Sequence, residues 1–446
     1  MDDPTLPLPG LSPVAGRSVK ACFDGGSLSS DAGVLVLREI ESRLGVAERL
    51  ARCIADPRNP DLITHSLADL IRFRMMMIAA GYEDGNDAAS LRQDPVFKMA
   101  QGIAPSDHHL ASQPTISRLE NMTDVRALLR MATALVDLYC ASFKQVPKRI
   151  ILDIDDTFDA VHGGQQLRLF NGHYDEYGFQ PLVVFDGDGR FVTAVLRPAR
   201  RPKGVEIRGH LRRLIGAIRS HWPGVEILIR ADSHYGLPEV IDLCRATEVD
   251  FILGVPTSTR LQKHVRTLEA RVAAQFEAAP GTGKVRRFTD VYDGADSWSR
   301  TERIIARVET GDQGTDTRFI VTNLTNCKPK ALYEKVYCRR GSAENHIKSW
   351  KTHLAADRTS CTRATANQFR LFLHAGAYWM MWGLRTAMPK RSIWRIAQFD
   401  TLRLRLIKIA ARVVERKTQI RLHMPTASPV QSILRIVLGR IPRLAT

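Results

Sequence analysis

The sequence predicts a mixed α/β protein, in which a mixed β-sheet is flanked by helices, carries a β-rich insertion and lies between helical N- and C-terminal regions. Apolar residues recur at helical spacing before residue 147. Short β-branched runs then alternate with amphipathic helical segments up to residue 256. After residue 360 the sequence pattern is helical and basic to the end, which completes the expected architecture.

The composition points to a polyanionic partner. The chain has 446 residues, a net charge of +17 and a pI of about 9.8, which favours nucleic acid over a membrane. Residues 351–446 contain 18 lysines and arginines against 3 acidic residues, so they carry 15 of the 17 surplus charges. A basic segment on a nearly neutral body is typical of a core with an extension that faces DNA or RNA.

The cysteines and the apolar segments exclude several classes of protein. The seven cysteines are scattered and include no C-x2-C pair, which predicts a reduced cytoplasmic protein with neither a zinc site nor a disulfide framework. The start MDDPTLPLPG is acidic and rich in proline, unlike a targeting peptide. Residues 371–384 are the most apolar stretch, but they are too short to span a bilayer and predict a buried helix.

The chain divides at its changes of pattern. The expected parts are a loose arm (residues 1–30), a helical domain (31–146), a sheet domain in two pieces (147–256 and 331–360), a β-rich insertion (257–330) and a basic helical region (361–446). Within 147–256 the elements follow the order β-β-β-α-β-α-β, and the DGDG turn marks a hairpin. This order describes a mixed sheet with helices packed on it.

Two details of the helical domain bear on function. The methionine run at 75–77 is expected in the core rather than at a cofactor. The stretch SQPTISR provides hydroxyl groups and a proline where a helix can begin, with Arg118 in the first turn. Arg118 could therefore bind a phosphate at this helix end, although simple capping of the helix explains the same pattern.

Aspartates follow two strands of the predicted sheet. Asp155 closes the first strand and Asp232 closes the fourth. If these two strands are adjacent, both carboxylates lie at one edge of the sheet. Asp153 lies two residues before Asp155 and points to the same face of the strand, so it remains an alternative for the first of the two aspartates.

A helical stripe carries a third acid. Tyr337, Arg340, Glu344 and Lys351 have the spacing Y-x2-R-x3-E-x6-K, which places them within roughly 60° of one helical face at about 100° per residue. Lys348 falls on the same arc. The stripe suits phosphate binding beside a carboxylate, and the alternative is a solvated charged helix.

Three carboxylates at one point are stable together only around cations. Hard oxygen ligands without a cluster of histidine or cysteine predict Mg²⁺, and Mn²⁺ is the alternative ion. Two such ions about 4 Å apart can activate a water or a 3′-hydroxyl and stabilise the leaving oxygen of a displacement at phosphorus. The basic C-terminal region predicts the same nucleic-acid chemistry.

The motifs LDIDDT, RADSHYG and the Y-x2-R-x3-E-x6-K helix resemble those of the DDE transposases of bacterial insertion sequences. These have an RNase H-like core, and the likeness is to the IS-four-like group with the YREK signature. The stretches QQLRLFNGHYDEYGFQPLVVFDGDG and DGGSLSSDAGVLVLREI resemble its IS-thirteen-eighty branch, and the resemblance covers about residues 20–420. One departure is DIDDT, where many relatives have one aspartate before a small residue.

The resemblance implies roles for the matching positions. Asp155, Asp232 and Glu344 would hold two Mg²⁺ ions. Tyr337, Arg340 and Lys351 would hold phosphates near the transposon end, and Lys348 lies beside them on the stripe.

The resemblance also implies an activity. The enzyme would bind terminal inverted repeats, nick each end of the element and transfer strands into target DNA within a homodimer. In several relatives, cleavage passes through a DNA hairpin. Residues 31–146 would serve in DNA binding and assembly, and the two sheet segments would form the catalytic core. The place of action would be the bacterial cytoplasm, at the nucleoid when bound to DNA.

Two further sets of residues are candidates for DNA contact. Trp298, in the insertion, could stack on a flipped base as in relatives, or it could be a core residue. Arg412, Arg416 and Lys417 are expected to contact phosphates, or else to form a solvated face on helices that dimerise.

Two other functions use the same fold, a stand-alone nuclease and a domesticated DNA-binding protein that has lost catalysis.

Overall fold

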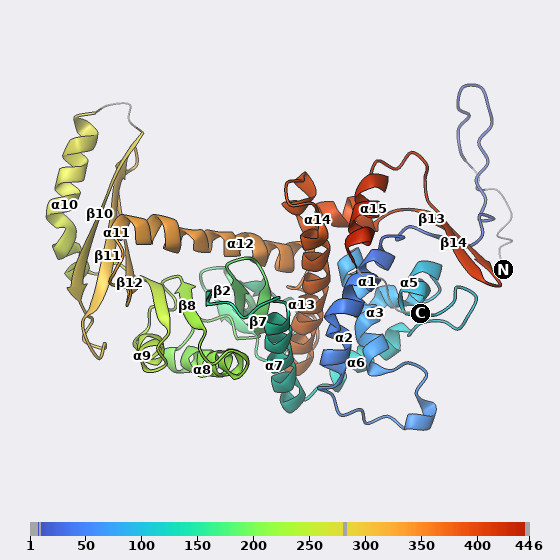
Figure 1. Ribbon diagram of the computed structural model, residues 1–446, viewed down its shortest axis with the longest axis horizontal. Helices are drawn as coiled ribbons and strands as arrows, with labels where there is room; N and C mark the ends of the chain where they lie inside the picture. The colour runs from blue at the N-terminus through green and yellow to red at the C-terminus, as the bar shows by residue number, and fades with distance from the viewer. Residues whose placement is uncertain (1–7, 9, 280–282, 442–446) are drawn as a thin grey trace. The chain divides into compact units, whose positions relative to one another are not determined.

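The computed structural model describes residues 8, 10–279 and 283–441 (Figure 1). The chain divides into two compact units. The terminal unit contains the described residues of Met1–Met122 and Gly376–Thr446, and the sheet unit is Thr123–Ala375. Each unit is described by itself.

An eight-stranded mixed sheet forms the sheet unit, in the order β10-β11-β12-β9-β8-β2-β6-β7. The core strands are β2 (Arg149–Asp156), β6 (Leu182–Asp186), β7 (Phe191–Val195), β8 (Glu226–Ala231) and β9 (Asp250–Val255). Strand β2 is parallel to β8 and antiparallel to β6, and β8 is parallel to β9. The predicted mixed sheet is confirmed, and its first and fourth strands, β2 and β8, are adjacent.

Helices cover this sheet because their apolar stripes match its buried strands. They are α7 (Val125–Ala141), α8 (Gly204–His221), α9 (Pro238–Ala246) and α12 (Gly341–Lys348). Strands β6 and β8 are buried almost throughout, which explains their continuous apolar sequences. Helix α7, which we expected in the helical domain, instead packs with α8 and β7 in the sheet unit, because Leu128, Met131 and Leu135 form a buried stripe. In Figure 1, α8 and α9 lie on one side of the strands and α12 on the other.

The insertion extends the core sheet. It begins with a helix that we did not predict, α10 (Thr259–Glu277), which buries Leu261, Val265 and Val272. Three antiparallel strands follow, β10 (Lys284–Asp293), β11 (Glu302–Gly311) and β12 (Gly314–Thr322). Strand β12 pairs with β9, from Phe319 opposite Val255 to Thr322 opposite Ile252. The β-rich insertion therefore continues the core sheet through direct backbone hydrogen bonds.

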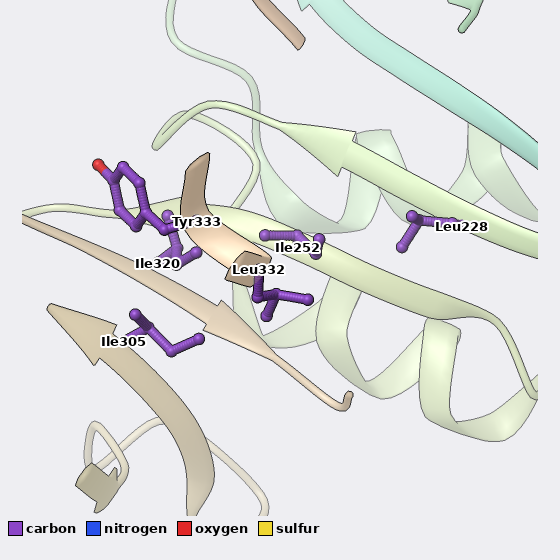
Figure 2. Packing of buried hydrophobic residues seen from close by; sticks show 6 residues of the cluster. All are labelled: Leu228, Ile252, Ile305, Ile320, Leu332 and Tyr333. Carbon is purple, nitrogen blue, oxygen red and sulfur yellow. The ribbon is translucent and has the colours of Figure 1, made fainter. Parts of the chain in front are cut away.

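One hydrophobic cluster joins the core strands, the insertion and the segment that leads to α12 (Figure 2). Its buried members are Leu228, Ile252, Ile305, Ile320, Leu332 and Tyr333. They come from β8, β9, β11, β12 and the turn η3 (Leu332–Tyr337). Because they pack together, the position of η3, and of the helical segment that follows it, depends on both parts of the sheet.

Short elements complete the sheet unit. They are β3 (Asp159–Ala160), β4 (Leu169–Asn171), β5 (Glu176–Phe179), α11 (Pro329–Ala331), η4 (Cys338–Arg340) and η5 (Ser349–His353). Strands β3, β5 and β4 form a small separate sheet. Helix α13 (Ala364–Ala387) belongs to the sheet unit up to Ala375 and to the terminal unit from Gly376. It contains the apolar stretch 371–384, and Leu371 and Leu384 are fully buried, as predicted. Within the described ranges, no helix is both long and apolar enough to cross a membrane.

The terminal unit is mainly helical. Its helices and turns are α1 (Val34–Leu44), α2 (Val46–Ala51), η1 (Pro60–Leu62), α3 (Leu67–Ala80), η2 (Gly85–Asp87), α4 (Ala88–Leu91), α5 (Pro95–Ala100), α6 (Gln113–Met122), η6 (Ile393–Arg395), α14 (Phe399–Leu402), η7 (Arg403–Ile407) and α15 (Gln431–Arg440). The methionine run at 75–77 is fully buried in α3, which confirms its place in the core.

The C-terminal region departs from the expected helices at residues 411–423. Strands β13 (Ala411–Arg416) and β14 (Gln419–His423) form a hairpin, and β1 (Leu28–Ser29) pairs with β13. The physical reason is the alternation in ARVVER, where Ala411 and Val413 are buried and Arg412 is exposed. The prediction of helix up to the chain end was wrong for this segment.

Candidate active site

Two aspartates meet at one edge of the sheet. The parallel register of β2 and β8 ends with Ile154 opposite Ala231, so Asp155 and Asp232 are the next residues at the carboxyl ends of both strands. Burial raises the pKa of Asp155 to about 6, the positive charge of Arg340 lowers it, and the negative charge of Asp232 raises it. The two carboxylates are therefore close enough to repel each other.

Asp153 occupies a different environment from Asp155. Its side chain is 1% exposed, and both of its oxygens accept hydrogen bonds of 2.7 Å from Arg230. Arg230 also donates to the carbonyl of Val336. Because both side chains of this ion pair are buried and hydrogen-bonded to each other, Asp153 is less available to a ligand than Asp155.

The predicted stripe lies on a helical segment of mixed geometry. Tyr337 ends a π-helical turn, Arg340 ends a 3₁₀ turn, and Glu344 and Lys348 lie on α12. Lys351 follows in a second π-helical turn. The segment is helical as predicted, but its turns are not uniformly α-helical, so the arc calculated at a constant angle per residue is only approximate.

Arg340 links the first aspartate to the glutamate. Its Nη1 lies 2.7 Å from Oδ2 of Asp155, and its Nη2 lies 3.9 Å from Oε1 of Glu344. The Glu344 side chain is 69% exposed. The guanidinium therefore places positive charge between two of the predicted ligands.

The donor set suits a hard divalent cation, because Asp155, Asp232 and Glu344 offer only carboxylate oxygens. Charge at the site is balanced by Arg340, whose guanidinium contacts Asp155. In the described part of the chain, no three histidine, cysteine or acidic side chains are placed closely enough to hold a metal ion. The structure therefore does not bring Asp155, Asp232 and Glu344 together as one metal-binding cluster.

A hydrogen-bond network behind the aspartates was not predicted. Asp156 accepts from Gln180 Nε2 at 2.8 Å and from the hydroxyl of Tyr235 at 3.4 Å. His234 Nδ1 lies 3.4 Å from Asp156 and 4.0 Å from Asp232, and its hydrogen bond with Asp156 raises its pKa. The sequence signal was the run SHYG after Asp232, which places polar groups directly beside a ligand candidate.

Two members of the stripe make internal contacts. Tyr337 packs edge-on against Tyr333, with ring centroids 5.5 Å apart, and burial raises its pKa. Lys351 donates to the carbonyl of Phe158, and its Nζ lies 3.6 Å from Oδ1 of the buried Asp159. Burial raises the pKa of Asp159 to about 8, against the effect of Lys351. Lys351 is thus directed toward β3.

Trp298 lies at the opposite edge of the sheet from Asp155 and Asp232. Asp293 pairs with Glu302, so Trp298 belongs to the turn between β10 and β11. This turn is on the side of the amino end of β9, because β12 runs antiparallel to both β9 and β11. Ser299 in the same turn donates to Asp242 on α9. The structure therefore does not bring Trp298 to the two aspartates.

The other predicted DNA contacts are exposed residues of the terminal unit. Arg118 lies in α6, which begins at Gln113 as expected, and it donates to Thr115 Oγ1 at 3.1 Å. Arg412 and Arg416 lie on β13, and Lys417 lies in the turn that follows. Lys348 on α12 of the sheet unit is also exposed. These side chains are accessible to a partner.

A hollow of about 590 Å³ opens beside Asp232. Tyr337 and Arg340 line it from the helical segment, and Arg307 and Arg318 line it from the insertion. The insertion thus forms one wall of the space next to the acidic edge. Each of the three arginines has an acidic partner: Asp316, which also lines the hollow, pairs with Arg307 and Arg318, and Asp155 pairs with Arg340.

The protein has a mixed sheet in which two aspartates follow adjacent parallel strands, and a glutamate lies on a later helix. This arrangement defines the class of proteins with a DDE domain, in which the acidic residues are two aspartates and a glutamate. The family model of the transposase DDE domain, group 1, matches residues 11–446, so this chain belongs to that family. Membership confirms the coarser part of the resemblance, a DDE transposase domain. Transposases of this kind generally use divalent metal ions.

No curated protein matches the sequence. A chain of a solved structure, the "Cryo-EM structure of piggyBac transposase synaptic complex with hairpin DNA", is similar at 11% identity and a TM-score of 0.43, over 93% of this chain and 86% of that chain. A likeness of this size carries no argument about function.

Proposed function

We propose that the protein is the transposase of a bacterial insertion sequence of the YREK group, which cuts DNA at terminal inverted repeats and joins the freed strands to target DNA. The observation that carries the proposal is the pair Asp155 and Asp232 at the ends of adjacent parallel strands, with Arg340 between Asp155 and Glu344. Membership of the DDE domain family supports it.

Asp155, Asp232 and Glu344 are the residues that would hold two Mg²⁺ ions, or Mn²⁺ in their place. When bound, such ions activate a water or a 3′-hydroxyl and stabilise the leaving oxygen. A pKa of about 6 leaves Asp155 mostly ionised above neutral pH, and therefore able to bind a cation. The like charge of Asp232 favours a cation at the same place.

Arg340 would orient the DNA strand. It lines the hollow beside Asp232 while one of its nitrogens holds Asp155. Its remaining N–H groups can donate to a phosphate, with Tyr337, Lys348 and Lys351 as further contacts near the transposon end. Trp298, at the opposite edge, would meet DNA only away from the aspartates.

The terminal unit would supply contacts with the rest of the duplex. Arg118, Arg412, Arg416 and Lys417 are exposed cations that can contact its phosphates. Two copies of the chain would pair the two ends of the element in a homodimer. Several relatives cleave through a DNA hairpin, whereas others do not. A denaturing gel of end-labelled DNA would distinguish the two routes, because a hairpin is a species of doubled length.

The test is Mg²⁺-dependent cleavage of a transposon-end duplex. We expect Asp232→Asn and Glu344→Gln to abolish cleavage while binding of the end persists, because both keep the side-chain shape and remove a ligand charge. Asp296→Asn is the matched control, since Asp296 is fully exposed at the edge where Trp298 lies. Wild-type cleavage by either ligand variant would refute the proposal. Cutting without any joining to target DNA would instead identify a nuclease.

A further inference from the structure

A hollow of about 560 Å³ lies within the terminal unit, built by segments far apart in sequence. Arg58 and His65 come from the loops around η1, Arg92 follows α4, His108 precedes α6, and Thr115 and Arg118 lie in the first turns of α6. Among the described residues that line this hollow, none is acidic. Its size is typical of a small-ligand site.

Two of its arginines have no counter-charge. Arg58 pairs with Asp56 at 2.6 Å, and His108 contacts Asp107 at 3.1 Å. Neither Arg92 nor Arg118 forms an ion pair with any residue that the structure describes. The Nε of Arg92 is buried, with no hydrogen-bond partner in the same described part of the chain. A buried donor of this kind costs free energy until an acceptor reaches it.

The histidines also favour an anion. The rings of His65 and His108 lie 5.9 Å apart. Burial lowers the pKa of His65, and the charges of His108, Arg92 and Arg58 lower it further, whereas Asp69 raises it. The environment therefore resists another positive charge, and a bound anion would relieve that repulsion.

Hydroxyl groups complete the set of donors. Ser112 Oγ and Thr115 Oγ1 lie 3.1 Å apart at the start of α6, and Thr115 accepts from Arg118. Guanidinium, imidazole and hydroxyl groups around one hollow are the partners that a tetrahedral oxyanion requires.

We infer that this hollow binds a phosphate group, through Arg92 and Arg118 with help from His65, His108 and Thr115. The phosphate is either a phosphodiester of the DNA backbone or a free phosphate. The DNA source rests on the proposed function, whereas the chemistry of the hollow does not depend on it.

The experiment compares Arg92→Gln and Arg118→Gln with the control Arg43→Gln in the full chain. Arg43 is exposed in the last turn of α1 and lies outside the hollow, so the control makes the same charge change. Binding to a random duplex is measured by fluorescence anisotropy in EDTA over a range of KCl. Thermal stability is measured with and without inorganic phosphate at constant ionic strength.

We expect each hollow variant to bind the duplex about tenfold more weakly than the control, since a charged hydrogen bond is removed. The slope of log affinity against log salt should fall by about 0.9 for each phosphate that the variant no longer neutralises. If duplex binding is unchanged but phosphate no longer raises the melting temperature, the site takes free phosphate. If both measurements match the control, the inference is wrong. Arg118 is exposed, so its variant tests the site even if Arg92→Gln folds poorly.

EDTA separates this test from catalysis. Failure of Asp232→Asn to lose cleavage would overturn the proposed function and leave the phosphate site untouched. If Arg118→Gln weakens neither duplex binding nor the stabilisation by phosphate, the phosphate site is overturned and the assignment of the acidic residues to cleavage is untouched.

Discussion

Arg340 Nη1 lies 2.7 Å from Oδ2 of Asp155, although the two residues are separated by 185 positions in the sequence. The contact ties the end of β2 to the helical segment that carries Glu344. Burial of both partners is partial, with side chains 17% and 16% exposed. The ion pair therefore lies where a ligand can reach it from solvent.

Replacing Arg340 by glutamine should slow cleavage about a hundredfold, because the reacting phosphate then lacks one charged donor. Single-turnover cleavage of an end duplex with saturating Mg²⁺ measures the effect. Arg339→Gln is the control, since Arg339 is the neighbouring exposed arginine. Equal rates for the two variants would mean that Arg340 serves only the fold.

Asp153 and Asp155 should differ in their effect on stability. Asp153→Asn leaves Arg230 buried without its counter-ion and should lower the free energy of unfolding by about 3–5 kcal/mol. Asp155→Asn should leave it equal or higher at pH 8, because ionising a carboxyl whose pKa is raised costs the folded state. Urea denaturation of both variants checks this, and equal losses would contradict the assignment.

Glu41 should make stability fall as pH rises. It is buried in α1 and accepts from the backbone N–H groups of Ala47 and Val46, and burial raises its pKa from 4.5 to about 7. Between these values the folded chain keeps the proton that the unfolded chain has released, so the free energy of unfolding decreases by up to about 3 kcal/mol. Glu41→Gln should gain stability relative to wild type between pH 5 and pH 8. A constant difference in urea denaturation would contradict this.

Trp298→Ala should keep cleavage within about twofold of wild type, since the residue lies at the edge opposite the aspartates. The same single-turnover assay provides the comparison with Arg340→Gln. A decrease as large as that of the arginine variant would show that DNA reaches the β10–β11 turn during the reaction.

Neutralising Arg412, Arg416 and Lys417 together should weaken binding to all duplexes alike. The salt slope should fall by about 0.9 for each phosphate that these side chains neutralise in the wild-type complex. Anisotropy with the inverted repeat and with a scrambled duplex tests this. Weaker binding to the repeat alone would indicate contacts with bases instead.

The sequence could predict the elements whose signal is local. The β-branched runs and the hairpin turn were enough to predict the core strands and the edge of the sheet at which Asp155 and Asp232 lie. The ion pair of Asp153 with Arg230 was not predictable, because periodicity assigns a face but not a partner. The edge at which Trp298 lies depends on the direction of β12 against β9, a pairing of distant segments. In the C-terminal hairpin, buried and exposed residues alternate at the start of β13. The charges of Arg412 and Arg416 made this strand pattern hard to recognise in the sequence.

The pairing of β12 with β9 also has a consequence for solubility. Without the insertion, β9 would form the edge of the core sheet and expose a row of free N–H and C=O groups. Such an edge is a template for strands of other chains. A shortened protein that lacks residues 257–330 would keep the acidic residues of the candidate site. Its copies would nevertheless associate through β9, which would lower its solubility.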